Sequence, residues 1–124
     1  MLMERPISIV VLGGGESGVG AALLAQKKGA KVFVSDRGNI GQNQQVELEL
    51  AGIEFESGQH TWERIFAADE VIKSPGIPDT VPLITQLHDQ GIPVIGEIEF
   101  ASRFTDAPLV AITGSNGKTT TAYL

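Results

Sequence analysis

The feature that most constrains the fold is a glycine-rich loop between a strand-like segment and a helix-like segment. Residues 7–12 form a run of mostly β-branched and apolar side chains, which is typical of a strand buried on both faces of a parallel sheet. The glycine-rich sequence GGGESG follows at once, at residues 13–18. Over residues 17–28, small side chains recur on one side of a predicted helix, so that the helix can pack closely against a sheet. The order of strand, glycine loop and helix indicates the first unit of a nucleotide-binding α/β fold.

Each glycine of this loop has a separate physical role. Gly13 permits a tight turn, Gly15 lets a pyrophosphate approach the backbone, and Gly18 lets the helix pack closely on the strand. The helix N-terminus supplies partial positive charge, so we expect backbone amides near Glu16 and Ser17 to donate to phosphate oxygens. The loop therefore predicts a phosphate-binding site.

Asp36 closes the second predicted strand, which covers residues 31–35. It lies about 20 residues beyond the glycine loop, where an acidic side chain accepts hydrogen bonds from a ribose hydroxyl or a base N–H. A glycine loop of this kind also occurs as a simple packing turn, and NAD or FAD is the conventional ligand when it does bind. From these residues taken by themselves, the alternatives stay open.

The remaining chain continues the alternation of strands and helices. Strands are predicted at 53–56, 70–73 and 92–95, and helices at 42–51, 62–68 and 97–104. A further helix is predicted to begin after Asp79 or Thr80 as its cap and to end at Gly91. Such alternation implies right-handed βαβ crossovers. We therefore predict an α/β, Rossmann-like domain over residues 1–107, with a mostly parallel sheet and helices on both faces.

A second glycine loop follows a sixth predicted strand at residues 109–112. Residues 108–124 are accordingly interpreted as the start of a truncated second domain, consisting of its first strand and a P-loop. Lys118 would bring a point charge to the β- and γ-phosphates, and the Thr119 hydroxyl would bind Mg²⁺. The spacing departs from the usual P-loop pattern, because Ile112 stands where that pattern has glycine. The predicted ATP-binding residues are Gly114, Ser115, Asn116, Gly117, Lys118, Thr119 and Thr120.

Composition excludes several classes of function. The absence of cysteine excludes disulfides, thiolate metal sites and cysteine nucleophiles. A net charge of −6 argues against sequence-independent binding to nucleic acid, which depends on Lys and Arg. No apolar stretch approaches the roughly 20 residues that span a bilayer, and no secretion signal is evident. We expect a cytoplasmic protein without nucleic-acid or membrane partners.

Several other side chains are interpreted as structural. His60 and His88 have no second metal ligand at a suitable spacing, so a surface or structural role is expected for both. Trp62 is expected to pack against the sheet, with stacking on a base as the minor alternative. Glu97 and Glu99 point apart on a helix and are expected on solvated faces or in contacts between domains.

Four segments together resemble the Mur ligases of peptidoglycan precursor synthesis. They are the loop at 13–18 with Asp36, the turn KSPGIP at 73–78, the segment GEIEF at 96–100 and the loop TGSNGKTTT at 113–121. The resemblance runs from about residue 7 to the end of the chain. Within the family, the segments are most similar to the members that add D-glutamate to UDP-N-acetylmuramoyl-L-alanine.

The resemblance implies that the first domain binds a UDP-sugar instead of NAD. Backbone groups at Glu16 and Ser17 would face the pyrophosphate, while Asp36, Arg37 and the turn at 74–76 would surround uracil and ribose. The full set of implied UDP-sugar-binding residues is Gly13, Gly15, Glu16, Ser17, Gly18, Asp36, Arg37, Ser74, Pro75 and Gly76. All these positions lie at the carboxyl ends of predicted strands, where open α/β sheets bind ligands.

The resemblance also implies a reaction. Members of the family use ATP and Mg²⁺ to phosphorylate a substrate carboxylate, and an amino group then attacks the acyl phosphate. Lys118 would be the catalytic cation in this chain, and Thr119 the metal ligand. The other catalytic groups of the family lie in sequence that this chain lacks, so we expect the 124-residue chain to be inactive.

Two alternatives remain at this stage. One is a fragment of the sister ligase that adds L-alanine to UDP-N-acetylmuramate, for which histidine is expected in place of Asn116. The other is an NAD-binding regulatory module, although the first domain is short for a six-stranded dinucleotide fold.

Overall fold

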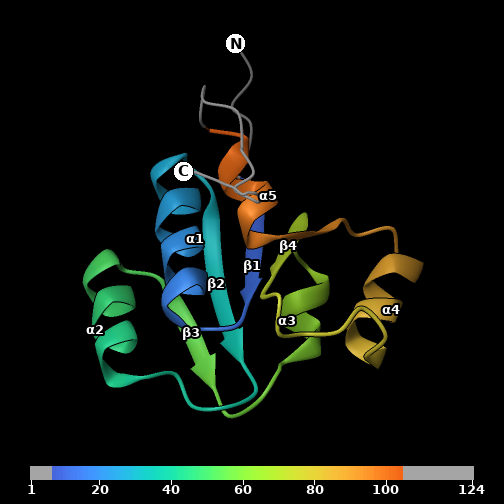
Figure 1. Ribbon diagram of the computed structural model, residues 1–124, viewed down its shortest axis with the longest axis horizontal. Helices are drawn as coiled ribbons and strands as arrows, with labels where there is room; N and C mark the ends of the chain where they lie inside the picture. Colours follow the sequence, from blue (N-terminus) through green and yellow to red (C-terminus); the bar gives the residue numbers. More distant parts are fainter. Residues whose placement is uncertain (1–6, 105–124) are drawn as a thin grey trace, which may run out of the picture.

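The computed structural model describes residues 7–104, which fold around one parallel sheet (Figure 1). The five strands lie in the order β3-β2-β1-β4-β5, and every neighbouring pair is parallel. The strands are β1 (Ser8–Leu12), β2 (Lys31–Asp36), β3 (Glu54–Ser57), β4 (Glu70–Lys73) and β5 (Val94–Gly96). The α/β, Rossmann-like prediction is confirmed for the described residues.

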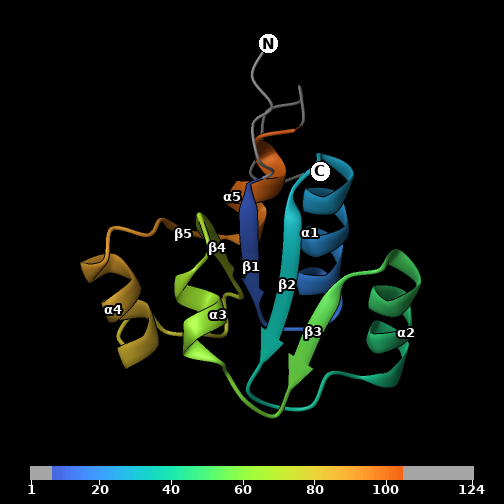
Figure 2. The same ribbon diagram turned by 180° about the vertical axis from the view of Figure 1, so that it is seen from behind.

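Helices follow each strand and cover both faces of the sheet. They are α1 (Glu16–Lys27), α2 (Gln42–Ala51), α3 (Trp62–Phe66), α4 (Pro82–Asp89) and α5 (Glu97–Ser102). Side chains of α1, α2 and α5 share one apolar core with the sheet, and those of α3 and α4 share the other. The two layers are seen from opposite sides in Figures 1 and 2.

The alternation of side chains along the central strands fills these two cores. On β1, Ile9 and Val11 belong to the core under α1, while Val10 and Leu12 belong to the core under α3 and α4. The last four residues of β1 are at most 5% exposed, as expected for a central strand covered on both sides. The buried strand β1 therefore fixes the position at which the glycine loop begins.

Element boundaries differ from the predictions at a few positions. Asp79 or Thr80 was the predicted cap of α4, but the residue at the N-cap is Val81, with Pro82 in the first turn and no side-chain cap. Asp79 instead forms an ion pair with Lys73, so its carboxylate is engaged by another element. Strand β5 begins at Val94, two residues later than predicted, because Pro93 has no N–H to donate to the ladder.

The strand order creates a topological switch point, the place in the sheet where successive connections run to opposite sides of β1. Strand β2 lies on one side of β1, and the chain later returns to place β4 on the other side. The loops after β1 and β4 therefore diverge at the same edge of the sheet, which is where open α/β sheets bind ligands. In Figure 1 the arrowheads of β2 and β3 point toward this edge.

Candidate functional site

A cleft of about 940 Å³ lies at the carboxyl edge of the sheet. Its walls come from the glycine loop, the end of β2, the segment after β3 and the turn after β4. The lining residues that the sequence singled out are Gly13, Gly15, Asp36, Arg37, Ser74 and Gly76. Residues far apart in the sequence therefore meet at one site. The other four predicted residues do not line this cleft: Ser17 and Pro75 line a second cleft of about 780 Å³, and Glu16 and Gly18 line neither of the two.

The glycine loop has the geometry that its sequence predicts. Gly13 adopts a φ of +112°, a conformation that favours glycine, and its N–H donates to the Ser35 carbonyl at 2.9 Å. A Cβ at Gly15 would meet no atom within 4 Å, so this position is open toward the cleft. A Cβ at Gly18 would lie 2.0 Å from the Gly13 carbonyl oxygen. The first and third glycines are thus required for close backbone packing, and the second leaves room for a ligand.

Asp36 holds the two loops beside it together. Its Oδ2 accepts the Gly14 N–H at 2.8 Å, and its Oδ1 accepts the Gly38 N–H at 2.8 Å. Carboxylate hydrogen bonds to backbone amides are among the stronger ones in proteins. Each oxygen keeps a further lone pair, so the predicted contact with a ribose hydroxyl or a base stays possible. The structure adds a role in shaping the loop that the sequence did not indicate.

The turn after β4 closes the other side of the cleft. The Ile77 N–H donates to the Ser74 carbonyl at 3.0 Å, and the Ser74 N–H donates to the carbonyl of Leu12, the last residue of β1, at 3.1 Å. A Cβ at Gly13 would lie 2.9 Å from the Ser74 Cβ, so the turn and the glycine loop touch. The glycine loop and the turn after β4 therefore lie side by side at the switch point and together form the base of the cleft.

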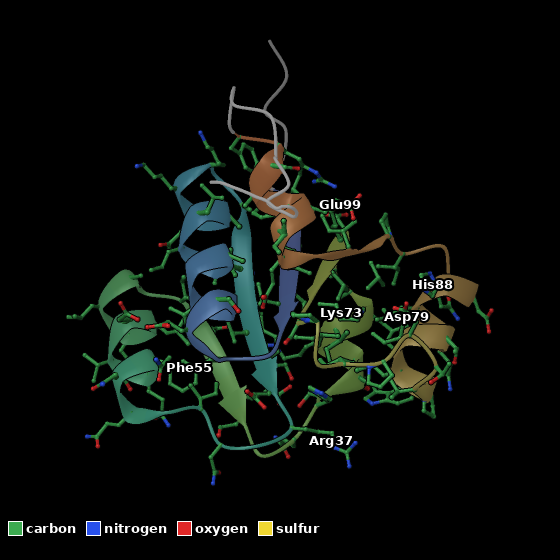
Figure 3. The ribbon with its side chains drawn as sticks, in the orientation of Figure 1. Arg37, Phe55, Lys73, Asp79, His88 and Glu99 are labelled. Atoms are coloured by element: carbon green, nitrogen blue, oxygen red, sulfur yellow. The ribbon has the colours of Figure 1, made fainter. Side chains whose placement is uncertain are left out.

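Lys73 fastens this turn, although no sequence pattern indicated it. Its Nζ donates to the Ile77 carbonyl at 2.7 Å and lies 3.3 Å from the Asp79 carboxylate. Only 15% of the Lys73 side chain is exposed, whereas 76% of the Asp79 side chain is exposed. Figure 3 shows the two side chains beside α3 and α4. The half-buried bond to the carbonyl is therefore the stronger of the two contacts.

Replacing Lys73 by methionine is expected to lower the free energy of unfolding by about 1–2 kcal/mol. Methionine keeps most of the apolar stem but leaves the Ile77 carbonyl without its charged donor. The matched control is Asp79→Asn, which removes only the exposed partner and is expected to change stability by less than about 0.5 kcal/mol. Urea denaturation of both variants measures the difference, and equal losses would contradict this division between the two contacts.

The wall formed by β2 and the segment after β3 contains a hydrogen-bonded side-chain network. The fully buried Ser35 hydroxyl lies 2.8 Å from Glu56 Oε2 and 2.6 Å from His60 Nδ1. Glu56 also accepts the Thr61 N–H at 2.7 Å and the Thr61 hydroxyl at 2.6 Å. The hydrogen bond to Ser35 agrees with the structural role expected of His60, and the structure adds that this side chain lines the cleft.

Ionisation states in this network follow from its contacts. Burial raises the pKa of Glu56, but hydrogen bonds from Thr61, Ser35 and Gln59 together outweigh burial and hold that pKa below its ordinary value. Burial lowers the pKa of His60, and the nearby Arg37 lowers it further, against the opposing effects of Glu56 and Asp36. At neutral pH the network therefore contains an ionised glutamate and a neutral histidine.

Trp62 is not packed under the sheet as expected, and Glu97 does not lie on a solvated face; the alternative for Glu97, a contact between domains, lies outside the described residues. The Trp62 ring stacks on Phe66 with centroids 5.6 Å apart and is 39% exposed at the rim of the cleft, because α3 carries both rings on one side. Glu97 is only 8% exposed, since α5 packs against α1, and its Oε2 has no hydrogen-bond partner within residues 7–104. By contrast, Glu99 and His88 are exposed, as expected (Figure 3).

The predicted ATP site lies outside the described residues. This holds for the sixth strand and for Gly114 through Thr120, including Lys118 and Thr119. Across residues 7–104, no three side chains of the kinds that bind metals gather into a cluster. In the same range, no helix combines the length and apolar character needed to cross a membrane.

Comparisons with known proteins agree with this geometry. The family model described as "Mur ligase MurD-like, N-terminal domain" matches residues 7–96. A UDP-N-acetylmuramoylalanine–D-glutamate ligase of Bacteroides fragilis is 59% identical over 94% of this chain and 26% of its own length. A protein of the same name from Porphyromonas gingivalis is 61% identical over 91% of this chain and 25% of its own length.

A solved structure shows the same fold. The murein peptide ligase of Psychrobacter arcticus superposes with a TM-score of 0.71 at 27% identity, covering 80% of this chain and 21% of that protein. The chain spans about a quarter of the length of the curated relatives that it matches. The family model covers most of the chain, and its match includes the glycine loop, Asp36 and the turn after β4. The chain therefore belongs to the MurD-like Mur ligases and contains their N-terminal domain.

Proposed function

We propose that the described domain binds the UDP portion of a sugar-nucleotide substrate. The observation that carries this proposal is the convergence of the glycine loop, Asp36 and the turn at 74–76 on one cleft at the switch point of the sheet. Backbone amides at the start of α1 supply a partial positive charge for the pyrophosphate. Asp36, Arg37 and the turn would then surround uracil and ribose.

The residues present fit such a ligand. Gly15 leaves open space where a side chain would block the approach of a phosphate, and Glu16 and Ser17 are exposed beside it. Arg37 contributes a cation to the same cleft. A volume of about 940 Å³ lies within the ordinary range of small-molecule sites, about 300–1,000 Å³, and suits a nucleoside diphosphate.

The proposed activity of the whole protein is that of a ligase in peptidoglycan synthesis. It would add D-glutamate to UDP-N-acetylmuramoyl-L-alanine in the cytoplasm, with ATP and Mg²⁺ supplying phosphoryl transfer to the substrate carboxylate. The substrate carboxylate would take the γ-phosphoryl group of ATP to become an acyl phosphate with release of ADP, and attack by the amino group of D-glutamate would then form the amide bond and release inorganic phosphate. In this proposal Lys118 and Thr119 hold the ATP phosphates and the metal. The identity of 59–61% with curated D-glutamate ligases supports this reading over the L-alanine-adding alternative.

Titration of the purified 124-residue chain tests the proposal, and we expect saturable binding of UDP and of UDP-N-acetylmuramoyl-L-alanine. Isothermal calorimetry with each ligand and with NAD measures the three affinities under one set of conditions. NMR shifts assign the binding site, and they are expected at Gly15, Ser17 and Asp36. Saturable binding of NAD together with no response to either uridine nucleotide would contradict the proposal.

A further inference from the structure

The buried network behind the cleft determines which ring nitrogen of His60 carries a proton. The Ser35 hydroxyl has a single hydrogen, and two of its neighbours, Glu56 Oε2 at 2.8 Å and the Gln59 carbonyl at 3.3 Å, can only accept. The hydroxyl must therefore donate to one of these oxygens. Its oxygen then accepts from His60 Nδ1, which lies 2.6 Å away. The hydrogen-bonding pattern thus assigns the neutral tautomer with the proton on Nδ1.

This tautomer leaves His60 Nε2 with a lone pair. His60 lines the cleft, and no hydrogen bond to Nε2 is formed within residues 7–104. Its neighbours differ from it in chemistry. Each Asp36 oxygen already accepts one backbone amide and keeps one further lone pair, Arg37 can only donate, and the side chain of Gln59 carries a donor and an acceptor. His60 Nε2 is therefore a side-chain acceptor in this part of the cleft that no described residue engages.

We propose that His60 Nε2 accepts a hydrogen bond from the nucleoside of the bound uridine nucleotide, and that Ser35 and Glu56 hold the ring in the accepting tautomer. The inference rests on the proposed UDP site and adds a specificity-determining residue to it. Two groups of uridine have the required chemistry, the imide N–H of uracil and a ribose hydroxyl. Both are donors, and the nucleoside end of the cleft is where Asp36, Arg37 and His60 meet.

The test compares the 124-residue chain with its His60→Asn variant. Asparagine can still donate an N–H to Ser35 at the position of Nδ1, but it lacks the acceptor at the position of Nε2. At pH 8 we expect the variant to bind UDP about tenfold more weakly, the effect of losing one hydrogen bond. Urea denaturation of both proteins is the folding control and is expected to give similar midpoints.

Ligand analogues distinguish the two possible donors. 3-Methyl-UDP lacks the imide N–H, and 2′-deoxy-UDP and 3′-deoxy-UDP each lack one ribose hydroxyl. The analogue without the relevant donor should bind wild-type and variant chains equally, while the other analogues keep the tenfold difference. An equal difference for all four ligands would mean that His60 acts only through the shape of the cleft, and would overturn the inference.

The pH dependence gives a readout that a structural role would not produce. Protonation of Nε2 converts the acceptor into a donor, so the advantage of the wild type over the variant should be complete above the pKa of His60 and disappear below it. Glu56, Asp36 and Arg37 are the charged groups that face the ring, and they are unchanged in the variant. Taking the ratio of the two affinities at each pH cancels titration of the UDP phosphate.

Two failures are distinguishable. If the wild-type chain binds UDP but the ratio of affinities is near one at all pH values, only the role of His60 is overturned. If neither protein binds UDP, the proposed function fails and this inference fails with it.

Discussion

Replacing Gly18 by alanine is expected to abolish UDP binding and to lower the free energy of unfolding by about 3 kcal/mol. The added Cβ would lie 2.0 Å from the carbonyl oxygen and 3.0 Å from the carbonyl carbon of Gly13. Both are backbone atoms at the end of the central strand, so no side-chain rotation relieves the overlap. Either α1 moves away from the sheet or the glycine loop is displaced, and in both cases the amides at the start of α1 leave their positions.

The matched control lies one turn or less away in the same helix. Gly20 is exposed, and a Cβ there would meet no atom within 4 Å. Gly20→Ala is therefore expected to raise stability by about 0.5–1 kcal/mol, because alanine favours helix, and to leave UDP affinity unchanged. Urea denaturation and calorimetry of both variants measure the contrast. Wild-type UDP affinity in Gly18→Ala would show that the loop geometry is not needed for binding.

Asp36→Asn is expected to weaken UDP binding by about 10- to 100-fold, with a loss of stability of about 1.5–3 kcal/mol. Asparagine has one carboxamide oxygen, so it can accept only one of the amides of Gly14 and Gly38 at the present geometry. Its NH₂ group would face the other N–H, leaving a partly buried donor unpaired. The glycine loop and the loop after β2 would then separate at the nucleoside end of the cleft.

Whether Asp36→Asn weakens or strengthens UDP binding distinguishes the loss of hydrogen bonds from the loss of negative charge. Removing a negative charge beside an anionic ligand strengthens binding when charge is the only change. The matched control is Glu16→Gln, which neutralises an exposed carboxylate in the first turn of α1 without breaking a hydrogen bond found in residues 7–104. We expect Glu16→Gln to bind UDP as tightly as the wild type or slightly more tightly. Stronger binding by Asp36→Asn would contradict the loop-shaping role of Asp36.

Local sequence patterns were sufficient for the architecture of the described residues. The apolar run that became β1, and the glycines after it, predicted a buried parallel strand entering a tight turn, because burial on both faces requires apolar side chains and the positive φ of Gly13 favours glycine. The glycine spacing in residues 13–18 likewise predicted which position needs close packing, and the Gly18 geometry confirms it. These features could be predicted because each depends on residues that are close together in the sequence.

The partners of polar side chains could not be read in the same way. The contact of His60 with Ser35 has no periodic signature, since it depends on how the segment after β3 packs on β2. The contact of Lys73 with the Ile77 carbonyl lies within one turn, but it depends on the path of the backbone through that turn and not on a repeating pattern of side chains. The burial of Glu97 depends on α5 meeting α1, two elements far apart in the sequence. The positions of the strands, helices and glycine turns were thus set by local apolar burial and backbone conformation. Which acceptors and donors line the cleft was decided only when the strand order brought four distant segments to one edge of the sheet.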